Sequence, residues 1–154
     1  MVEANSVTVP DLLVVRNAEG GTLLEGGKIE GEITAGVIDE IPMPAVLGAM
    51  SRQGIEIRDA AELRVKETDR IATVADNLGR MGVRVEIFDD GMKIPGRQTF
   101  QAAALDSFGD HRIAMAFAVA ALRAMGPCQI NNAEATSVSF PEFYELLGSI
   151  VQRS

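Results

Sequence analysis

The first third of the chain alternates short apolar runs with glycines, a pattern typical of strands joined by turns. Apolar or alternating stretches predict strands at 12–15, 22–25, 28–33 and 55–58. Pro42 and Pro44 precede an apolar run and predict a helix over 42–52, because proline fits the first turn of a helix. We therefore expect a small group of antiparallel strands, followed by a helix and a further strand.

The clearest helical pattern begins near residue 68. Apolar residues recur there every three or four positions, at Ile71, Val74, Ala75, Leu78 and Met81. Gly82 is a suitable helix end, and the residues after it predict a strand over 83–88. An Asp-Asp-Gly turn at 89–91 then leads into a partner strand over 92–94, so a β-hairpin is expected after the helix.

Residues 98–108 fit either a strand or a loop, and a strongly apolar segment follows them. Asp110 is expected to cap a helix that runs to Met125, before a Gly-Pro pair. Because residues 113–122 are apolar on nearly all sides, this helix is expected to be buried.

The last part of the chain predicts a strand and a closing helix. The strand is expected over 128–131. Ser139 and Glu142 have the spacing of a capping box, and Pro141 stands inside the first turn that they would form. The closing helix is therefore expected to begin at Ser139.

Two parts of the chain resemble each other at an offset of 72 residues (133 − 61), which aligns Ala61-Glu62 with Ala133-Glu134. The same offset superimposes three apolar pairs, namely Ile71 on Phe143, Val74 on Leu146 and Leu78 on Ile150. Such self-similarity is typical of folds built from repeated units. We therefore expect a single domain over 1–154, with successive repeat units at about 1–95 and 96–154.

Composition and charge exclude several classes of protein. The 154 residues are 47% hydrophobic, enough for an ordinary core, and the net charge of −8 disfavours binding to nucleic acid. The longest apolar run, 113–122, is too short to span a bilayer, and the start of the chain lacks a signal-peptide pattern, so no membrane partner is expected. Cys128 is the single cysteine, which favours a reducing, cytoplasmic location.

Charged residues gather at three predicted helix starts. The candidates for chemistry are Asp39, Lys66, Glu67, Arg70, His111 and Arg112. If the equivalent helix starts of a repeat face the same side, these groups form one site for acid–base chemistry on a small anionic substrate. No phosphate-binding loop, dinucleotide fingerprint, nucleophile elbow or metal-ligand pattern is found in the sequence, so we expect neither a cofactor nor a metal.

Each group also has an ordinary structural explanation. Asp39 and Asp110 could simply cap helices. Glu67 and Arg70 could form a surface ion pair on a solvated first turn. Arg112 could extend its aliphatic part along apolar surface and hold its charge in water. The sequence pattern alone leaves these alternatives open.

Three segments at these positions, 38–42, 62–70 and 108–115, together resemble the 5-enolpyruvylshikimate-3-phosphate synthase family in residues and in order. The resemblance runs from about Asp11 to the end of the chain and covers the C-terminal portion of the family. It implies an α+β (mixed α/β) fold of repeated βαβαββ units, an inside-out barrel with buried parallel helices and sheets outside. This chain would be an incomplete domain of that fold.

The resemblance also implies an activity without a cofactor. Members of this family transfer the enolpyruvyl group of phosphoenolpyruvate to the 5-hydroxyl of shikimate 3-phosphate and release phosphate, on the route to aromatic amino acids. By motif, Asp39 is similar to the proton acceptor at the shikimate hydroxyls, and Lys66 to a residue near the same hydroxyls. Glu67 is similar to the residue that helps to protonate the methylene carbon, and Arg70 and Arg112 to a clamp for phosphoenolpyruvate.

Other features depart from the family pattern. The role of His111 stays open between proton transfer and orientation. The family's N-terminal Lys-Ser-x-x-x-Arg element has no counterpart here, and Val138 stands where some relatives carry lysine. We therefore expect a half-built site that is inactive without the missing N-terminal part. A UDP-N-acetylglucosamine enolpyruvyl transferase and a noncatalytic anion-binding module are the alternatives.

Overall fold

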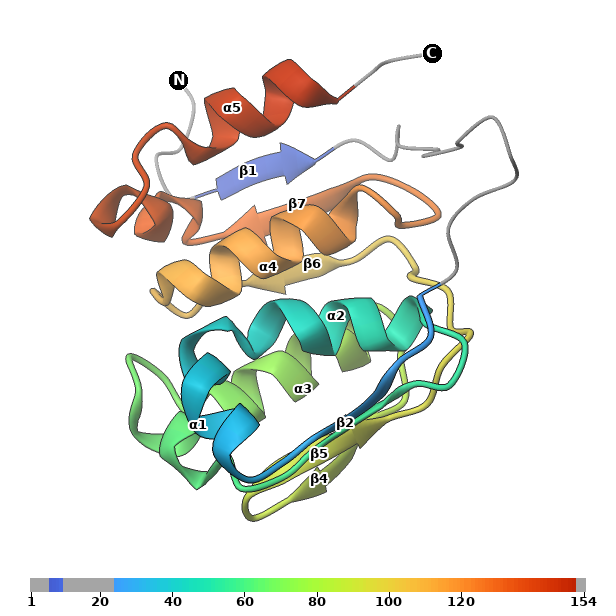
Figure 1. Ribbon diagram of the computed structural model, residues 1–154. Coiled ribbons are helices and arrows are strands. Elements are labelled where there is room, and N and C mark those ends of the chain that lie inside the picture. The colour runs from blue at the N-terminus through green and yellow to red at the C-terminus, as the bar shows by residue number, and fades with distance from the viewer. Residues whose placement is uncertain (1–5, 10–23, 152–154) are drawn as a thin grey trace.

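Two small β-sheets and a group of helices between them make up the fold (Figure 1). The computed structural model describes residues 6–9 and 24–151 of the chain. The strands are β1 Ser6–Val9, β2 Gly27–Ile29, β3 Ile55–Ile57, β4 Glu86–Phe88, β5 Gly91–Ile94, β6 Ala104–Asp106 and β7 Cys128–Asn131. The helices are α1 Glu32–Val37, α2 Pro42–Met50, α3 Arg70–Arg80, α4 His111–Ala121 and α5 Phe143–Ile150. Three 3₁₀ helices join them, η1 Ile38–Glu40, η2 Ala61–Val65 and η3 Ala133–Val138.

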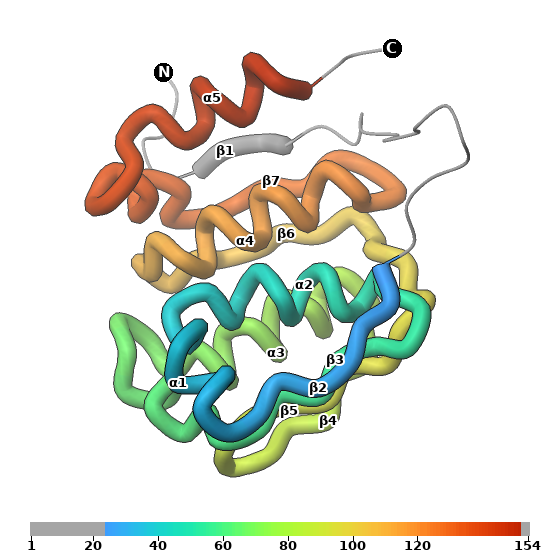
Figure 2. The backbone as a smooth tube through the Cα atoms, viewed as in Figure 1, coloured from blue at the N-terminus to red at the C-terminus, as the bar shows by residue number. Residues whose placement is uncertain are grey.

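The segment from β2 to β5 is a complete βαβαββ unit. Its sheet has the strand order β2-β3-β5-β4, in which β2 and β3 are parallel and the other neighbours are antiparallel. Parallel neighbours need a crossover connection, which α1 and α2 provide here. Figure 2 shows this path, in which the chain leaves β2, passes through α1 and α2 and returns beside β2 as β3.

A second unit repeats this arrangement from β6 to α5. Strands β6 and β7 are parallel, as β2 and β3 are, and β7 pairs on its other side with β1 in antiparallel register. The repeat at an offset of 72 residues (133 − 61) is confirmed, because η2 begins at Ala61 and η3 begins at Ala133. The boundary between units at about residue 95 stays a prediction.

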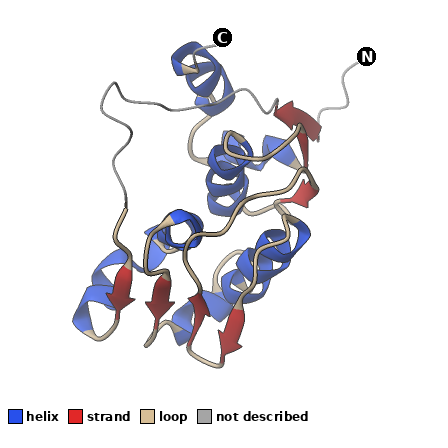
Figure 3. Cartoon of the chain, turned by 90° about the vertical axis from the view of Figure 1, so that its right-hand side faces the viewer, coloured by secondary structure: helices blue, strands red, loops and turns tan. Residues whose placement is uncertain are grey.

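The core lies between the two sheets, where α2, α3 and α4 pack against one another. Seen from the side in Figure 3, the strands lie at the periphery and the helices cover their inner faces. Helix α4 contributes Ile113, Phe117 and five alanines to the buried set, which confirms that this apolar helix is buried. The predicted mixed α/β fold with helices inside and sheets outside is therefore confirmed.

The apolar residues of α3 and α5 superimpose in the repeat but differ in burial. Ile71, Val74 and Leu78 of α3 are at most 1% exposed. In α5, by contrast, Leu146 is 48% exposed and Ile150 is 67% exposed. Helix α3 contacts α2, α4 and β6, whereas α5 has no fully buried residue. The repeat therefore reproduces the backbone and not the packing.

Several predicted boundaries are wrong. The strand expected over 28–33 ends at Ile29, and residues 32–37 form α1 instead, because Gly31 turns the chain with a φ of 62°. The expected strand 12–15 lies outside the described residues. Of the strand expected at 22–25, the first two residues lie outside the described residues and the last two form no strand. The helices expected to reach residues 52 and 125 end at Met50 and Ala121, and the strand over 83–88 begins only at Glu86.

The capping box predicted at Ser139 does not form. The backbone N–H groups of Ser139 and Phe140 both donate to the carbonyl oxygen of Thr136, which extends the turn of η3 through these residues. Helix α5 therefore begins at Phe143, with Glu142 at its N-cap position and no side-chain capping bond.

Among the described residues, no single helix is long and apolar enough to span a membrane. The segments 32–40 and 42–50 meet such a criterion only when taken together, and they are bent by 95° with respect to each other.

Two glycine-to-alanine changes should have opposite effects on stability. A Cβ at Gly91 would overlap the carbonyl oxygen of Ile57 on the neighbouring strand, so Gly91→Ala should lower the free energy of unfolding by about 2 kcal/mol or more. Gly79, in α3, has open space at its Cβ, so Gly79→Ala should raise that free energy by about 0.5 kcal/mol. Urea unfolding of both variants tests this, and equal effects would contradict the strand pairing of β3 with β5.

Candidate active site

The candidate residues lie on η1, on the turn between η2 and α3, and at the first residues of α3 and α4. Both helix starts are fixed by aspartates, because Asp69 accepts from the N–H of Ala72 at 3.1 Å and Asp110 accepts from that of Arg112 at 3.0 Å. The buried side chain of Asn77 further bonds both backbone groups of Asp106, at the end of β6. This anchors the loop that leads to α4.

Arg70 and Asp110 form the centre of the site. The Arg70 side chain is 2% exposed and the Asp110 side chain is 0% exposed. Nε and Nη2 of Arg70 donate to the two carboxylate oxygens of Asp110 at 2.9 and 3.1 Å, a bidentate contact. Thr68 donates its hydroxyl to the same carboxylate at 2.9 Å. Burial alone would raise the pKa of Asp110, but the hydrogen bonds from Arg70 and Thr68 hold it below its ordinary value.

The other edge of the Arg70 guanidinium faces two further carboxylates. Nη2 donates to Glu67 at 2.7 Å, and Nη1 reaches Asp39 at 3.5 Å. Glu67 and Asp39 are about half exposed, at 52% and 49%. The ion pair of Glu67 with Arg70 that the sequence left open is therefore present, but Arg70 itself is not on a solvated surface.

Lys66 lies beside this group with two carboxylate partners. Its Nζ is 3.1 Å from Asp39 and 3.0 Å from Glu62. The hydrogen bonds that Lys66 donates to Glu62 and Asp39 raise the pKa of Lys66, and the same bond to Asp39 lowers the pKa of Asp39. Near neutral pH the lysine is thus protonated and Asp39 is ionised.

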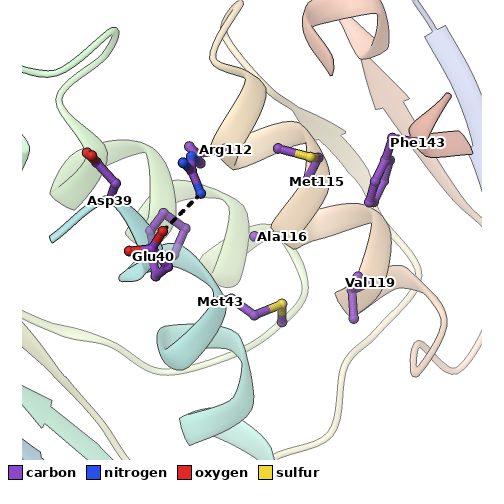
Figure 4. A pocket seen from close by; sticks show the side chains of 9 residues that line it. Asp39, Glu40, Met43, Arg112, Met115, Ala116, Val119 and Phe143 are labelled. Atoms are coloured by element: carbon purple, nitrogen blue, oxygen red, sulfur yellow. Dashed lines mark hydrogen bonds and ion pairs between the residues drawn. The ribbon is translucent and has the colours of Figure 1, made fainter. Parts of the chain in front are cut away.

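Arg112 stands at the rim of a pocket of 220 Å³ between α2, α4 and α5 (Figure 4). Its Nη1 contacts Glu40 of η1 at 3.4 Å, the interaction drawn as a dashed line in Figure 4. The wall behind this pair is apolar and includes Met43, Met115 and Phe143. The pocket lining is thus charged at one end and apolar over the rest.

The structure brings four of the predicted residues into one contact network: Asp39, Lys66, Glu67 and Arg70. Arg112 joins the same region through Glu40, the neighbour of Asp39. His111 lies at the first position of α4, and its side chain bonds to no described residue. The site roles of all six residues stay predictions.

Sequence reasoning missed the part played by Thr68, Glu40 and Asp110. Asp110 was expected only to cap a helix, yet the same carboxylate also holds Arg70. A signal was available, because a capping aspartate uses one acceptor position and keeps others free. Thr68 and Glu40 carry no pattern that separates them from ordinary surface residues.

The carboxylates of this network outnumber its cations. Its carboxylates are Asp39, Glu40, Glu62, Glu67 and Asp110, and its cations are Lys66, Arg70 and Arg112. Five carboxylates against three cations leave a formal excess of two negative charges. Among the described residues, no group of three histidine, cysteine or acidic side chains is arranged to hold a metal ion. The arrangement can exchange protons through its carboxylates, and each of its three cations already has at least one internal carboxylate partner.

The fold is that of the enolpyruvyl transferases. The solved enolpyruvyl transferase NikO from Streptomyces tendae matches 73% of this chain with a TM-score of 0.61 at 23% identity, a likeness that concerns the fold alone. An EPSP synthase from Acinetobacter baumannii matches 84% of the chain with a TM-score of 0.78 at 36% identity, and the chain covers 31% of that structure.

The chain belongs to the EPSP synthase (3-phosphoshikimate 1-carboxyvinyltransferase) family, whose sequence model matches residues 7–147. It is 65% identical over 129 residues to the 3-phosphoshikimate 1-carboxyvinyltransferase of Solibacter usitatus and 56% identical over 130 residues to that of Koribacter versatilis. Each match covers 84% of this chain and 30% of the relative. The chain thus spans under one third of the length of the curated relatives that it matches.

Asp110→Asn should destabilise the chain by about 3 kcal/mol near neutral pH, since it leaves the buried Arg70 with fewer charged partners. Because the pKa of Asp110 is lowered from 3.8, its contribution is complete above that pH and is lost as pH falls through the folded-state value. Urea unfolding at several pH values should therefore show that the difference in stability between the unchanged chain and Asp110→Asn becomes smaller as the pH falls below 3.8.

Asp76→Asn is the matched control for this change. Asp76 forms an ion pair with Arg80 at 2.9 Å, but both side chains are substantially exposed, at 47% and 36%. Such a pair contributes under about 1 kcal/mol. An equal loss of stability in both variants would show that the burial of the Arg70–Asp110 pair has no special effect.

Proposed function

We propose that this chain forms part of the active site of a transferase that moves the enolpyruvyl group of phosphoenolpyruvate to the 5-hydroxyl of shikimate 3-phosphate, with release of phosphate. The observation that carries the proposal is the convergence of Asp39, Lys66, Glu67 and Arg70 within one contact network. Membership of the EPSP synthase family supports it. This reaction lies on the route to aromatic amino acids, and we propose that the protein carries it out in the cytoplasm.

Asp39 and Lys66 are suited to the hydroxyl that attacks. The lowered pKa of Asp39 keeps its carboxylate ionised, as a proton acceptor must be, and half of its side chain is open to solvent. Lys66 lies 3.1 Å from the same oxygen atom that faces Arg70. We propose that Asp39 accepts the proton of the 5-hydroxyl and that Lys66 orients this hydroxyl.

Glu67, Arg70 and Arg112 are suited to phosphoenolpyruvate. This substrate carries a carboxylate and a phosphate, which guanidinium groups recognise through paired hydrogen bonds. Glu67, held at 2.7 Å from Arg70, would give a proton to the methylene carbon. His111, at the start of α4, would act as a proton-transfer aid or as an orienting group.

The charge balance explains why the chain should not turn over alone. Its part of the site carries more carboxylates than cations, whereas the two substrates are both multiply anionic. The additional cations must come from elsewhere, and we propose that the missing N-terminal part of the same enzyme supplies them. The excess of carboxylates gives no support to a noncatalytic anion-binding module.

Mixing the chain with the separately prepared N-terminal part of a homologous enzyme should restore phosphate release from phosphoenolpyruvate and shikimate 3-phosphate. Lys66→Ala should lower the rate of the mixture by about 100-fold or more, because it removes a positioned charge from the reacting hydroxyl. Lys93→Ala, at an exposed position of β5, is the matched control and should leave the rate unchanged. A steady-state phosphate assay measures both.

Two results would count against the proposal. The first is absence of turnover in the mixture while the chain is folded and the N-terminal part is active with its own C-terminal part. The second is turnover by the chain alone, which would contradict the expected need for the missing half.

A further inference from the structure

The three cations of the site differ in how firmly the chain itself holds them. Arg70 contacts three carboxylates and is 2% exposed. Lys66 contacts two carboxylates and is 19% exposed. Arg112 contacts a single carboxylate, that of Glu40, and is 37% exposed. Arg112 is therefore the cation that can most easily exchange its partner.

The contact between Arg112 and Glu40 uses a small part of what each group offers. It is one hydrogen bond of 3.4 Å from Nη1 to Oε1, and the Glu40 side chain is 58% exposed. Nε and Nη2 of Arg112 donate to no described residue, so one edge of the guanidinium is unused. A free anion with two suitable oxygens could form the bidentate contact that Glu40 does not form.

The position of the pair places it at the site and not on an unrelated surface. Glu40 and Arg112 are 72 residues apart, which is the offset of the internal repeat (133 − 61), so they stand at equivalent helix starts of the two units. Glu40 directly follows Asp39, and both line the pocket with Arg112 (Figure 4). The Glu40 carboxylate of the chain itself therefore lies against the guanidinium of Arg112, the group that is suited to bind an anion beside the pocket.

We propose that Glu40 is an internal competitor for Arg112, a carboxylate whose negative charge at the guanidinium opposes the binding of the anionic group of the substrate. This inference rests on the proposed function, because it assigns the exchange to the phosphoenolpyruvate side of that site. In the empty site Glu40 keeps the Arg112 charge compensated. When the substrate binds, it meets the negative charge of Glu40 at the same guanidinium, and this competition lowers the affinity for phosphoenolpyruvate.

The test is a double-mutant cycle read by phosphoenolpyruvate binding to this chain, followed through backbone amide NMR shifts at the start of α4. Glu40→Gln should bind phosphoenolpyruvate about two- to five-fold more tightly than the unchanged chain, the range expected for release of one exposed ion pair. In an Arg112→Gln background, Glu40→Gln should give no gain. Glu86→Gln is the matched control, because it removes one exposed carboxylate on β4 that forms no ion pair with any described residue.

An equal gain from Glu86→Gln, or a gain that persists in the Arg112→Gln background, would overturn the proposal in favour of a general charge effect. Unchanged affinity in Glu40→Gln, or the absence of any binding by this variant, would overturn it as well. Turnover in the mixture with the N-terminal part is measured separately. If that mixture is active while Glu40→Gln shows no gain, the assignment of Glu40 fails and the proposed function stands.

Discussion

The buried ion pair of Arg70 with Asp110 is the contact on which the rest of the site depends. Asp110 belongs to the start of α4 in the second unit, and Arg70 begins α3 in the first. One carboxylate therefore caps a helix, binds a guanidinium at two points and accepts a hydroxyl from Thr68. Because neither side chain is exposed to water, removal of one charge would leave the other buried without its partner, at a large cost in free energy. The pair fixes the distance between the two helix starts.

The remaining groups are placed by reference to this pair. Arg70 turns its outer edge toward Glu67 and Asp39, and Asp39 in turn positions Lys66. The carboxylates of the network differ in exposure, from 0% at Asp110 to about half at Asp39 and Glu67. The inner part of the network is therefore buried, and its rim is exposed. The inner charges are suited to holding geometry, and the outer ones are free to meet a substrate.

Local patterns predicted the elements that build the site, because their causes are local. The apolar period of α3, the turn before β5 and the aspartate before α4 each depend on neighbours in sequence. The burial of Asp110 depends on Arg70, 40 positions away, and no local pattern reports such a contact. The error at Ser139 has a similar cause, since competition from the η3 turn decides where α5 begins. Sequence patterns thus named the candidate residues that the structure brings together, but not the pair that holds them together.

The backbone of this site occurs in both units of the repeat, but the charged residues before α3 occur in only one of them. At the offset of 72 residues (133 − 61), Lys66 corresponds to Val138 and Glu67 to Ser139, so the start of the second copy lacks the same charges. The packing differs in the same sense, because α3 lies against α4 while Leu146 and Ile150 of α5 stay exposed. A site forms where the charged start of one unit meets the capped start of the next. In the second unit, Asp110 at the capped start of α4 binds Arg70 of the first unit. Helix α5, the last helix of the second unit, has no such capped helix start beside it among the described residues. The one-sided distribution of charge therefore arises on a repeated backbone, through the contacts between units.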